Sequence, residues 1–184
     1  MLLSREQGFP LFTGWAATLR GRSLIALGKA KEGLALLREG LVAIQSIGAV
    51  SGTPELLTYL AAAHAMLEQP TVGLNCLFEA AQIIEATEER RDEANLHRVR
   101  GDLLNATGDR SAAERSYQQA LAVARRQSAK LFELRTATSL ARLWRNQGKR
   151  AEARDLLAPI YAWFTEGFDA PDLVEAKALI DGLG

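Results

Sequence analysis

Arginine, asparagine and aspartate residues in the second half of the sequence have types and spacings that could bind a carboxylate. The set comprises Arg98, Asp102, Asn105, Arg135, Arg142, Arg145 and Asn146. Three of the six steps between neighbours in this set are three or four residues, and Arg135 and Arg142 are seven apart, so helices would place most of the set on one face. A guanidinium pairs with a carboxylate through two parallel hydrogen bonds, and an asparagine amide can hold an extended peptide backbone. These residue types predict binding of an acidic peptide segment or a C-terminal carboxylate, with a simply solvated face as the alternative.

The elements that would position these residues are copies of one repeating unit. Small residues recur every 40 positions, at Gly21, Ala61, Gly101 and Ala141. Four further columns share this spacing: Gly28, Glu68, Gly108 and Gly148; Gly33, Gly73, Ala113 and Ala153; Leu37, Leu77, Tyr117 and Leu157; and Gly40, Ala80, Ala120 and Ile160. Repeats of this length form stacks of supersecondary units that bury their apolar faces against one another.

Each unit is predicted to be a pair of helices, because its apolar residues recur at three- and four-residue steps. The column that contains Gly28 predicts a left-handed turn between the two helices, in which Glu68 would be mildly strained. The column that contains Gly21 predicts close approach of the paired helices. The expected organisation is a single domain over 1–184, with units at about 11–50, 51–90, 91–130 and 131–168, the tail of a preceding helix at 1–8 and a capping helix at 170–183.

Catalytic chemistry finds little support in the same pattern. The two histidines, His64 and His97, and the single cysteine, Cys76, fall in repeat columns that are otherwise mostly apolar, which favours packing roles. The charged run 88–93 mixes both signs where two units join, which favours a solvated loop over a metal cluster. Neither a phosphate-binding loop nor a dinucleotide fingerprint occurs in the sequence. We therefore expect no catalytic residues, no metal site and no cofactor.

With the small-residue column as its anchor, the pattern resembles the tetratricopeptide repeat over about 11–168. That repeat has about 34 residues, so the additional length here is expected in longer second helices and in the loops between pairs, and the proline near the end of the family's unit is absent. The resemblance implies an all-α, right-handed α–α superhelix of four helix pairs. It also implies that the first helices line a concave surface, on which the arginines and asparagines above would lie together with Thr18, Thr58 and Thr138.

A second resemblance is carried by the segments 96–101, 137–144, 152–157 and 163–168, which read LHRVRG, ATSLARLW, EARDLL and WFTEGF. These are similar to the C-terminal helical-repeat region of large bacterial signalling proteins. In such proteins a nucleotide cyclase or DNA-binding regulator domain precedes an ATPase domain and the repeat tail. The resemblance implies a fragment that lacks those domains and therefore carries no activity of theirs.

Composition narrows the class of partner and the compartment. The 184 residues have a formal net charge of zero, whereas a general nucleic-acid surface is usually strongly basic. A single cysteine favours a reducing environment. The sequence has no apolar run of about 20 residues and no secretory signal pattern. We expect a cytoplasmic protein that does not enter membranes and for which nucleic acid is an improbable partner.

The sequence thus favours a non-enzymatic module for protein–protein interaction or regulation. Its partner would be a protein or peptide, acidic if the arginines bind it, or another domain of the same polypeptide. Self-association through an incomplete N-terminal unit is a further expectation. The alternative is a sensor tail that binds a small ligand or nucleic acid and regulates an upstream cyclase, ATPase or DNA-binding domain.

Overall fold

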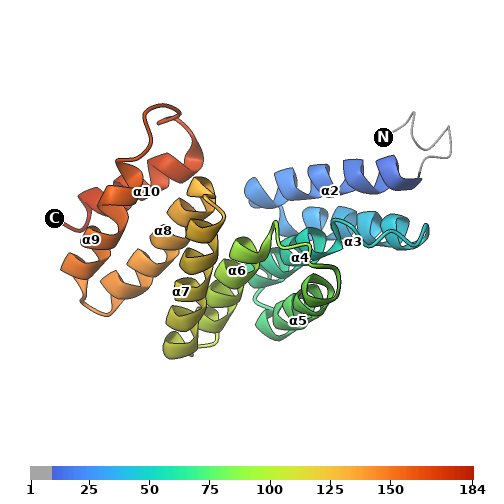
Figure 1. Cartoon of the computed structure of the whole chain (residues 1–184), viewed down its shortest axis with the longest axis horizontal. Coiled ribbons are helices and arrows are strands. Elements are labelled where there is room, and N and C mark those ends of the chain that lie inside the picture. The colour runs from blue at the N-terminus through green and yellow to red at the C-terminus, as the bar shows by residue number, and fades with distance from the viewer. Residues whose placement is uncertain (1–9) are drawn as a thin grey trace. The chain divides into compact units, whose positions relative to one another are not determined.

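The computed structural model describes residues 10–184, and this range contains helices and no strand (Figure 1). The helices are α2 (Pro10–Ala26), α3 (Ala30–Gln45), α4 (Thr53–Met66), α5 (Pro70–Thr87), α6 (Glu93–Ala106), α7 (Arg110–Arg126), α8 (Lys130–Asn146), α9 (Arg150–Tyr161) and α10 (Pro171–Asp181). Each repeat unit contains two of them, so the predicted all-α fold of helix pairs is confirmed. The predicted helix tail at 1–8 lies outside the described residues.

The helices form two compact units, which divide after Asp92. In the first unit α2 packs on α3 and α4 packs on α5, while α3 also contacts α4. In the second unit α6 pairs with α7 and α8 pairs with α9, α7 joins the two pairs, and α10 lies against α8 and α9 (Figure 1). Short turns make the helices of each pair antiparallel neighbours. That the whole chain forms a single domain stays a prediction.

The turn inside each pair has the left-handed conformation that the sequence predicts. The φ angles are +78° at Gly28, +89° at Gly108 and +83° at Gly148. Glu68 occupies the same column with φ at +56°, although it carries a Cβ. After the third turn, the Asp109 side chain accepts a hydrogen bond from the Ala112 amide at 2.9 Å and caps α7.

The small-residue column brings the backbones of the first pair together. A Cβ added to Gly21 would lie 3.0 Å from the Gly33 carbonyl oxygen, and one added to Gly33 would lie 2.8 Å from the Gly21 carbonyl oxygen. The predicted close approach is therefore confirmed in this pair. Leu37 of the bulky column also packs directly on Gly21, because the same added Cβ would lie 2.9 Å from its Cγ.

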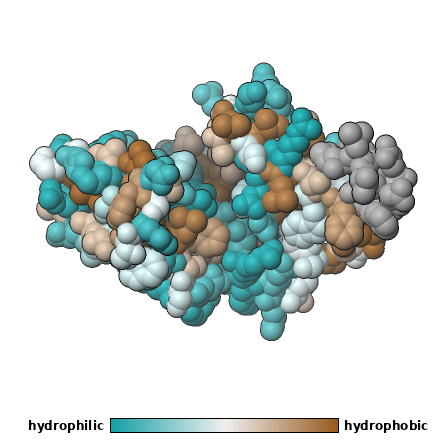
Figure 2. Space-filling view, turned by 90° about the horizontal axis from the view of Figure 1, so that it is seen from above, coloured by the Kyte–Doolittle hydropathy of each residue, from teal (hydrophilic) through white to brown (hydrophobic). Residues whose placement is uncertain are grey.

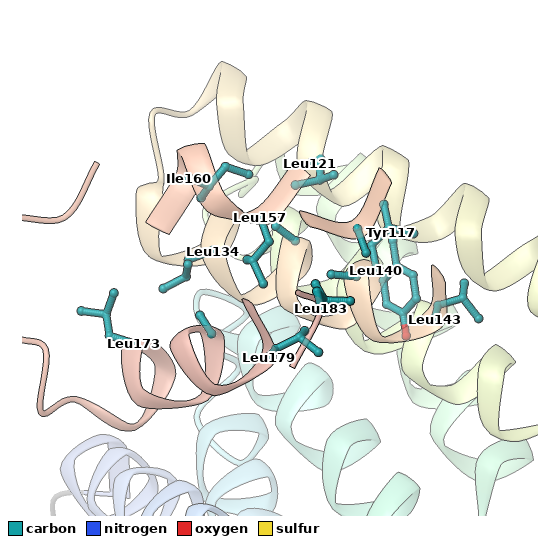
Figure 3. Packing of buried hydrophobic residues seen from close by; sticks show 14 of the residues in the cluster. Tyr117, Leu121, Leu134, Leu140, Leu143, Leu157, Ile160, Leu173, Leu179 and Leu183 are labelled. Atoms are coloured by element: carbon teal, nitrogen blue, oxygen red, sulfur yellow. The ribbon is translucent and has the colours of Figure 1, made fainter. Parts of the chain in front are cut away.

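The core of the second unit joins α7, α8, α9 and α10 (Figure 3). Leu134 and Leu157 are completely buried, and Tyr117 is 2% exposed. Helix α10 contributes Leu173 and Leu179, and Leu183 follows just after it; burying one such leucine stabilises the fold by about 1.5–3 kcal/mol. On α10 Leu179 is buried, whereas the neighbouring Ile180 is only partly buried.

Candidate functional site

The candidate site residues lie on α6 and α8, the two first helices of the second unit, which contact each other. Arg98, Asp102 and Asn105 come from α6, and the other four come from α8. The 40-residue register makes Asn105 the counterpart of Arg145, and Asp102 the counterpart of Arg142. Equivalent positions of neighbouring first helices thus bring both signs of charge to one side of the unit.

Arg98 and Asp102 are joined in a polar network on α6. Arg98 Nη1 donates to Asp102 Oδ2 at 2.6 Å. Asn95 Oδ1 accepts two further bonds from Arg98, from Nη2 at 2.9 Å and from Nε at 3.2 Å. The guanidinium is therefore committed to side chains of its own helix, and an acidic ligand would have to compete with Asp102 for it.

Tyr117 of α7 completes this network from the core. Its hydroxyl donates to Asp102 Oδ1 at 2.8 Å, while its ring lies beneath Gly101. Burial, the Asp102 charge and this hydrogen bond all raise the pKa of Tyr117 far above its ordinary value. The hydroxyl therefore stays protonated and acts as a fixed donor that orients Asp102.

Arg135 and Arg142 are paired with α10. Arg135 forms a two-pronged contact with Asp172, from Nε to Oδ1 at 2.8 Å and from Nη2 to Oδ2 at 2.7 Å. Arg142 Nη2 forms an ion pair with Glu175 Oε1. Burial lowers the pKa of Arg142, and the Asp102 carboxylate opposes that shift. Together with Arg98, three of the four candidate arginines thus already contact carboxylates of the chain itself.

The remaining three candidates are exposed at the C-terminal ends of α6 and α8. Asn105, Arg145 and Asn146 are all exposed. Within residues 10–184 their side chains make no hydrogen bond or ion pair. The repulsion between Arg145 and Arg142 contributes to the lowered pKa of Arg142, so the two guanidinium groups act on the same region. This end of the unit therefore presents positive charge and amide groups to solvent.

The threonine column does not line an open groove. Thr18, Thr58 and Thr138 are almost fully buried, and each hydroxyl donates to the carbonyl four residues earlier at 2.9 Å. Their hydroxyl donors are thus used within their own helices. Fewer residues are therefore available to a ligand than the positions on the first helices alone suggest.

The residues that resemble catalytic groups are dispersed. His64 Nδ1 lies 2.8 Å from Gln69 Oε1. His97 is on a different helix, where burial lowers its pKa, and burial raises the pKa of the half-buried Cys76 thiol. Among residues 10–184 no group of His, Cys, Asp and Glu side chains is arranged to hold a metal ion. In the same range no helix has the length and apolarity needed to cross a bilayer.

Sequence reasoning missed Asp172, Glu175 and the Tyr117 hydroxyl as parts of the site. For Glu175 the sequence does contain a signal, namely its spacing from an arginine. Arg22 and Glu55, which are 33 positions apart, form an ion pair in the first unit. Arg142 and Glu175 repeat both the residue types and the separation. The Tyr117 hydroxyl has no such signal, since the other residues of its column are leucines.

Comparison with known proteins supports the fold and leaves the ligand open. No family model matches the sequence, and no curated protein matches it. Among solved structures, the nearly identical TPR-like repeats of a kinesin light chain-like protein from Podosopora anserina are similar at 19% identity, with a TM-score of 0.63 over 91% of this chain and 83% of that one. A variant of that protein gives a TM-score of 0.65 at 18% identity with the same coverage. MamA gives 0.53 at 13% identity over 96% of this chain and 82% of its own. The chain therefore has the fold of tetratricopeptide-like repeat proteins.

Proposed function

We propose that the chain is a non-enzymatic scaffold module that binds a protein or peptide partner through an acidic segment. The observation that carries the proposal is the exposed group of Asn105, Arg145 and Asn146 beside the half-exposed Arg142. These residues lie at the ends of two neighbouring first helices, where arginine can pair with a carboxylate and the amides can bond to a peptide backbone. Arg98 and Arg135 have a supporting role, because their own carboxylates hold them in place.

Peptide titration tests this proposal. A labelled acidic peptide and a peptide of the same length with Gln and Asn in place of Glu and Asp are titrated against the full chain and its Arg142→Glu/Arg145→Glu variant. We expect the acidic peptide to bind the unmodified chain at least about fivefold more tightly than the variant, since two exposed charge pairs are each worth up to about 1 kcal/mol. Equal affinities of both peptides, or of both proteins, would refute the site.

A matched variant controls for net charge. Lys29→Glu/Lys31→Glu makes the same change in charge at two exposed lysines of the first unit. The acidic peptide should lose much less affinity for this variant, because neither lysine belongs to the proposed site and salt screens non-specific attraction between exposed charges. An equal loss in both variants would mean that the peptide responds to overall charge and has no defined site.

We infer further that the module belongs to a larger bacterial signalling protein in the cytoplasm, whose partner is another polypeptide or another domain of the same chain. The segments that resemble the repeat tails of such proteins support this inference. The reading frame of the gene tests it. A complete gene product without a cyclase, DNA-binding regulator or ATPase domain would contradict the inference and leave the scaffold proposal intact.

We also infer that the N-terminal end of the module self-associates. Phe12, Leu19 and Leu27 of α2 are 61%, 56% and 73% exposed, whereas Leu56 and Leu60 are buried on α4, which α3 covers. On the face shown in Figure 2, hydrophobic and hydrophilic side chains are interspersed. Sedimentation velocity should show concentration-dependent association that Leu19→Glu weakens and Val174→Glu, at an exposed position on α10, does not. A monomer at all concentrations would contradict this inference.

A further inference from the structure

Helix α10 lies on α8 in the same register that α4 takes on α2. Arg142 and Glu175 form an ion pair with the same types and the same 33-residue separation as Arg22 and Glu55. The Arg135 and Asp172 pair spans 37 positions, and Trp15 contacts Gly52 across the same span, because a Cβ added to Gly52 would lie 2.4 Å from the Trp15 ring. Helix α10 therefore occupies the place of a further first helix.

In the other first helices, certain columns of mostly small or apolar residues pack against a second helix. On α10, charged residues occupy the same positions. Lys177 continues the column of Ala17, Leu57, His97 and Ala137, and Asp181 continues the column of the small residues. Lys177 and Asp181 form an exposed ion pair with each other. These two columns thus present charge to solvent on α10, while the buried side of α10 docks on α8 and α9 through leucines.

The two ion pairs between α8 and α10 differ in strength. The Arg135 and Asp172 contact has two charge-assisted hydrogen bonds, and its side chains are 35% and 27% exposed. The Arg142 and Glu175 ion pair is the more exposed of the two, with side chains 41% and 51% exposed. A bidentate, more buried pair holds its geometry, whereas a more exposed ion pair contributes little and exchanges readily with solvent.

Arg142 also faces the exposed end of the proposed site. Arg145 lies one helical turn further along α8, and Asn146 follows it. A carboxylate that approaches Arg145 from solvent therefore meets Arg142 next, where Glu175 already supplies a carboxylate. Ligand and Glu175 would use the same guanidinium.

We propose that Glu175 is an internal competitor of the acidic partner for Arg142. The partner's carboxylate replaces Glu175, and the contact between α10 and α8 opens at that point while Asp172 keeps α10 anchored to Arg135. This inference rests on the proposed function, and it adds that the bound and free forms differ in how firmly α10 is held.

Peptide affinity of two charge-matched variants tests the competition. Glu175→Gln removes the competitor, and Asp181→Asn removes the same charge from α10 without touching Arg142. The labelled acidic peptide should bind Glu175→Gln about two- to fivefold more tightly than the unmodified chain, as removal of one exposed ion pair allows. Its affinity for Asp181→Asn should stay within about twofold of the unmodified value.

Hydrogen exchange of the α10 amides provides the second readout. Peptide binding should accelerate exchange in α10 of the unmodified chain and leave the already uncoupled Glu175→Gln variant unchanged. If the peptide binds but Glu175→Gln gains no affinity over Asp181→Asn, the competition is refuted and the acidic site stands. If the peptide binds none of these proteins, the proposed function fails and the competition fails with it.

Discussion

At the scale of single residues, Glu68 is the position where the chain departs most clearly from its own repeat. Glycine occupies the equivalent turn in three units, while Glu68 holds a left-handed φ of +56° with a side chain attached. We expect Glu68→Gly to raise the free energy of unfolding by about 0.5–1 kcal/mol, because the Cβ penalty is removed and the backbone need not move. Urea denaturation measures this difference.

The same substitution at a helical position is the control for Glu68. Glu79 is exposed in the middle of α5, where glycine should lower the free energy of unfolding by about 1 kcal/mol. Opposite signs at the two sites would show that the left-handed turn decides the effect. A loss of stability in both variants would contradict the strain assigned to Glu68.

Glu133 is the residue whose charge should matter most for stability at low pH. Burial alone would raise its pKa, but hydrogen bonds from Lys130 at 2.7 Å and Arg125 at 2.9 Å outweigh burial and lower the pKa below its ordinary value. A carboxyl with a lowered pKa in the folded state stabilises the fold above its unfolded pKa, and this contribution is lost as the pH falls through the folded value.

We therefore expect Glu133→Gln to cost about 1 kcal/mol at neutral pH, and we expect the difference from the unmodified chain to shrink toward about pH 3. Urea denaturation across this range measures it. Glu166→Gln, which removes a charge from the exposed loop before α10, should change the stability by less than about 0.5 kcal/mol. A Glu133→Gln deficit that stays constant with pH would contradict the role of its ionised form.

At the scale of elements, the contact between α6 and α7 depends on a matched pair of residues. A Cβ added to Gly101 would lie 2.4 Å from the Tyr117 ring, which is far inside contact distance. Gly101→Ala should therefore lower the free energy of unfolding by about 1–3 kcal/mol through overpacking. The second and fourth of the four sequence repeats have alanine with leucine at these positions, as Ala61 with Leu77 and Ala141 with Leu157.

A double-mutant cycle tests this pairing. In Gly101→Ala/Tyr117→Leu the leucine leaves room for the alanine, so the double variant should be less destabilised than the sum of the two single variants by about 1 kcal/mol or more. Tyr117→Leu alone leaves Asp102 without the hydroxyl donor and should cost about 1 kcal/mol. Additive effects would show that Gly101 and Tyr117 do not constrain each other.

The elements were predictable where one helix contacts its repeat partner, and less so elsewhere. The columns of Gly21 and Gly28 correctly indicated helix pairs and their turns. Close approach of two backbones and a positive φ angle both favour small residues, so these features leave a repeated pattern of small residues in the sequence. A second left-handed column, at Gly48, Glu88 and Ser128, was missed because only one of its members is glycine. The ion pairs between α8 and α10 were missed because they depend on the charges of side chains on two different helices. A column of residues with similar size carries no information about such charges.

At the scale of the whole molecule, the net charge of zero favours an acidic peptide over nucleic acid as the partner. Duplex DNA binding relies on neutralising many phosphates, and a chain with 22 basic and 22 acidic residues offers no excess for it. An acidic peptide needs only a local site such as Arg142 and Arg145. We therefore expect the chain to bind the acidic peptide and not duplex DNA.

Fluorescence anisotropy with a labelled acidic peptide and a labelled DNA duplex tests this separation. At physiological salt we expect peptide binding that weakens as salt is added, because exposed ion pairs are screened, and no measurable binding of the duplex. The Lys29→Glu/Lys31→Glu variant should leave both results unchanged. Duplex binding that disappears in Arg142→Glu/Arg145→Glu, without peptide binding by the unmodified chain, would instead establish the sensor alternative. In that case the exposed C-terminal end of α8, with Arg142 and Arg145, would be a nucleic-acid surface.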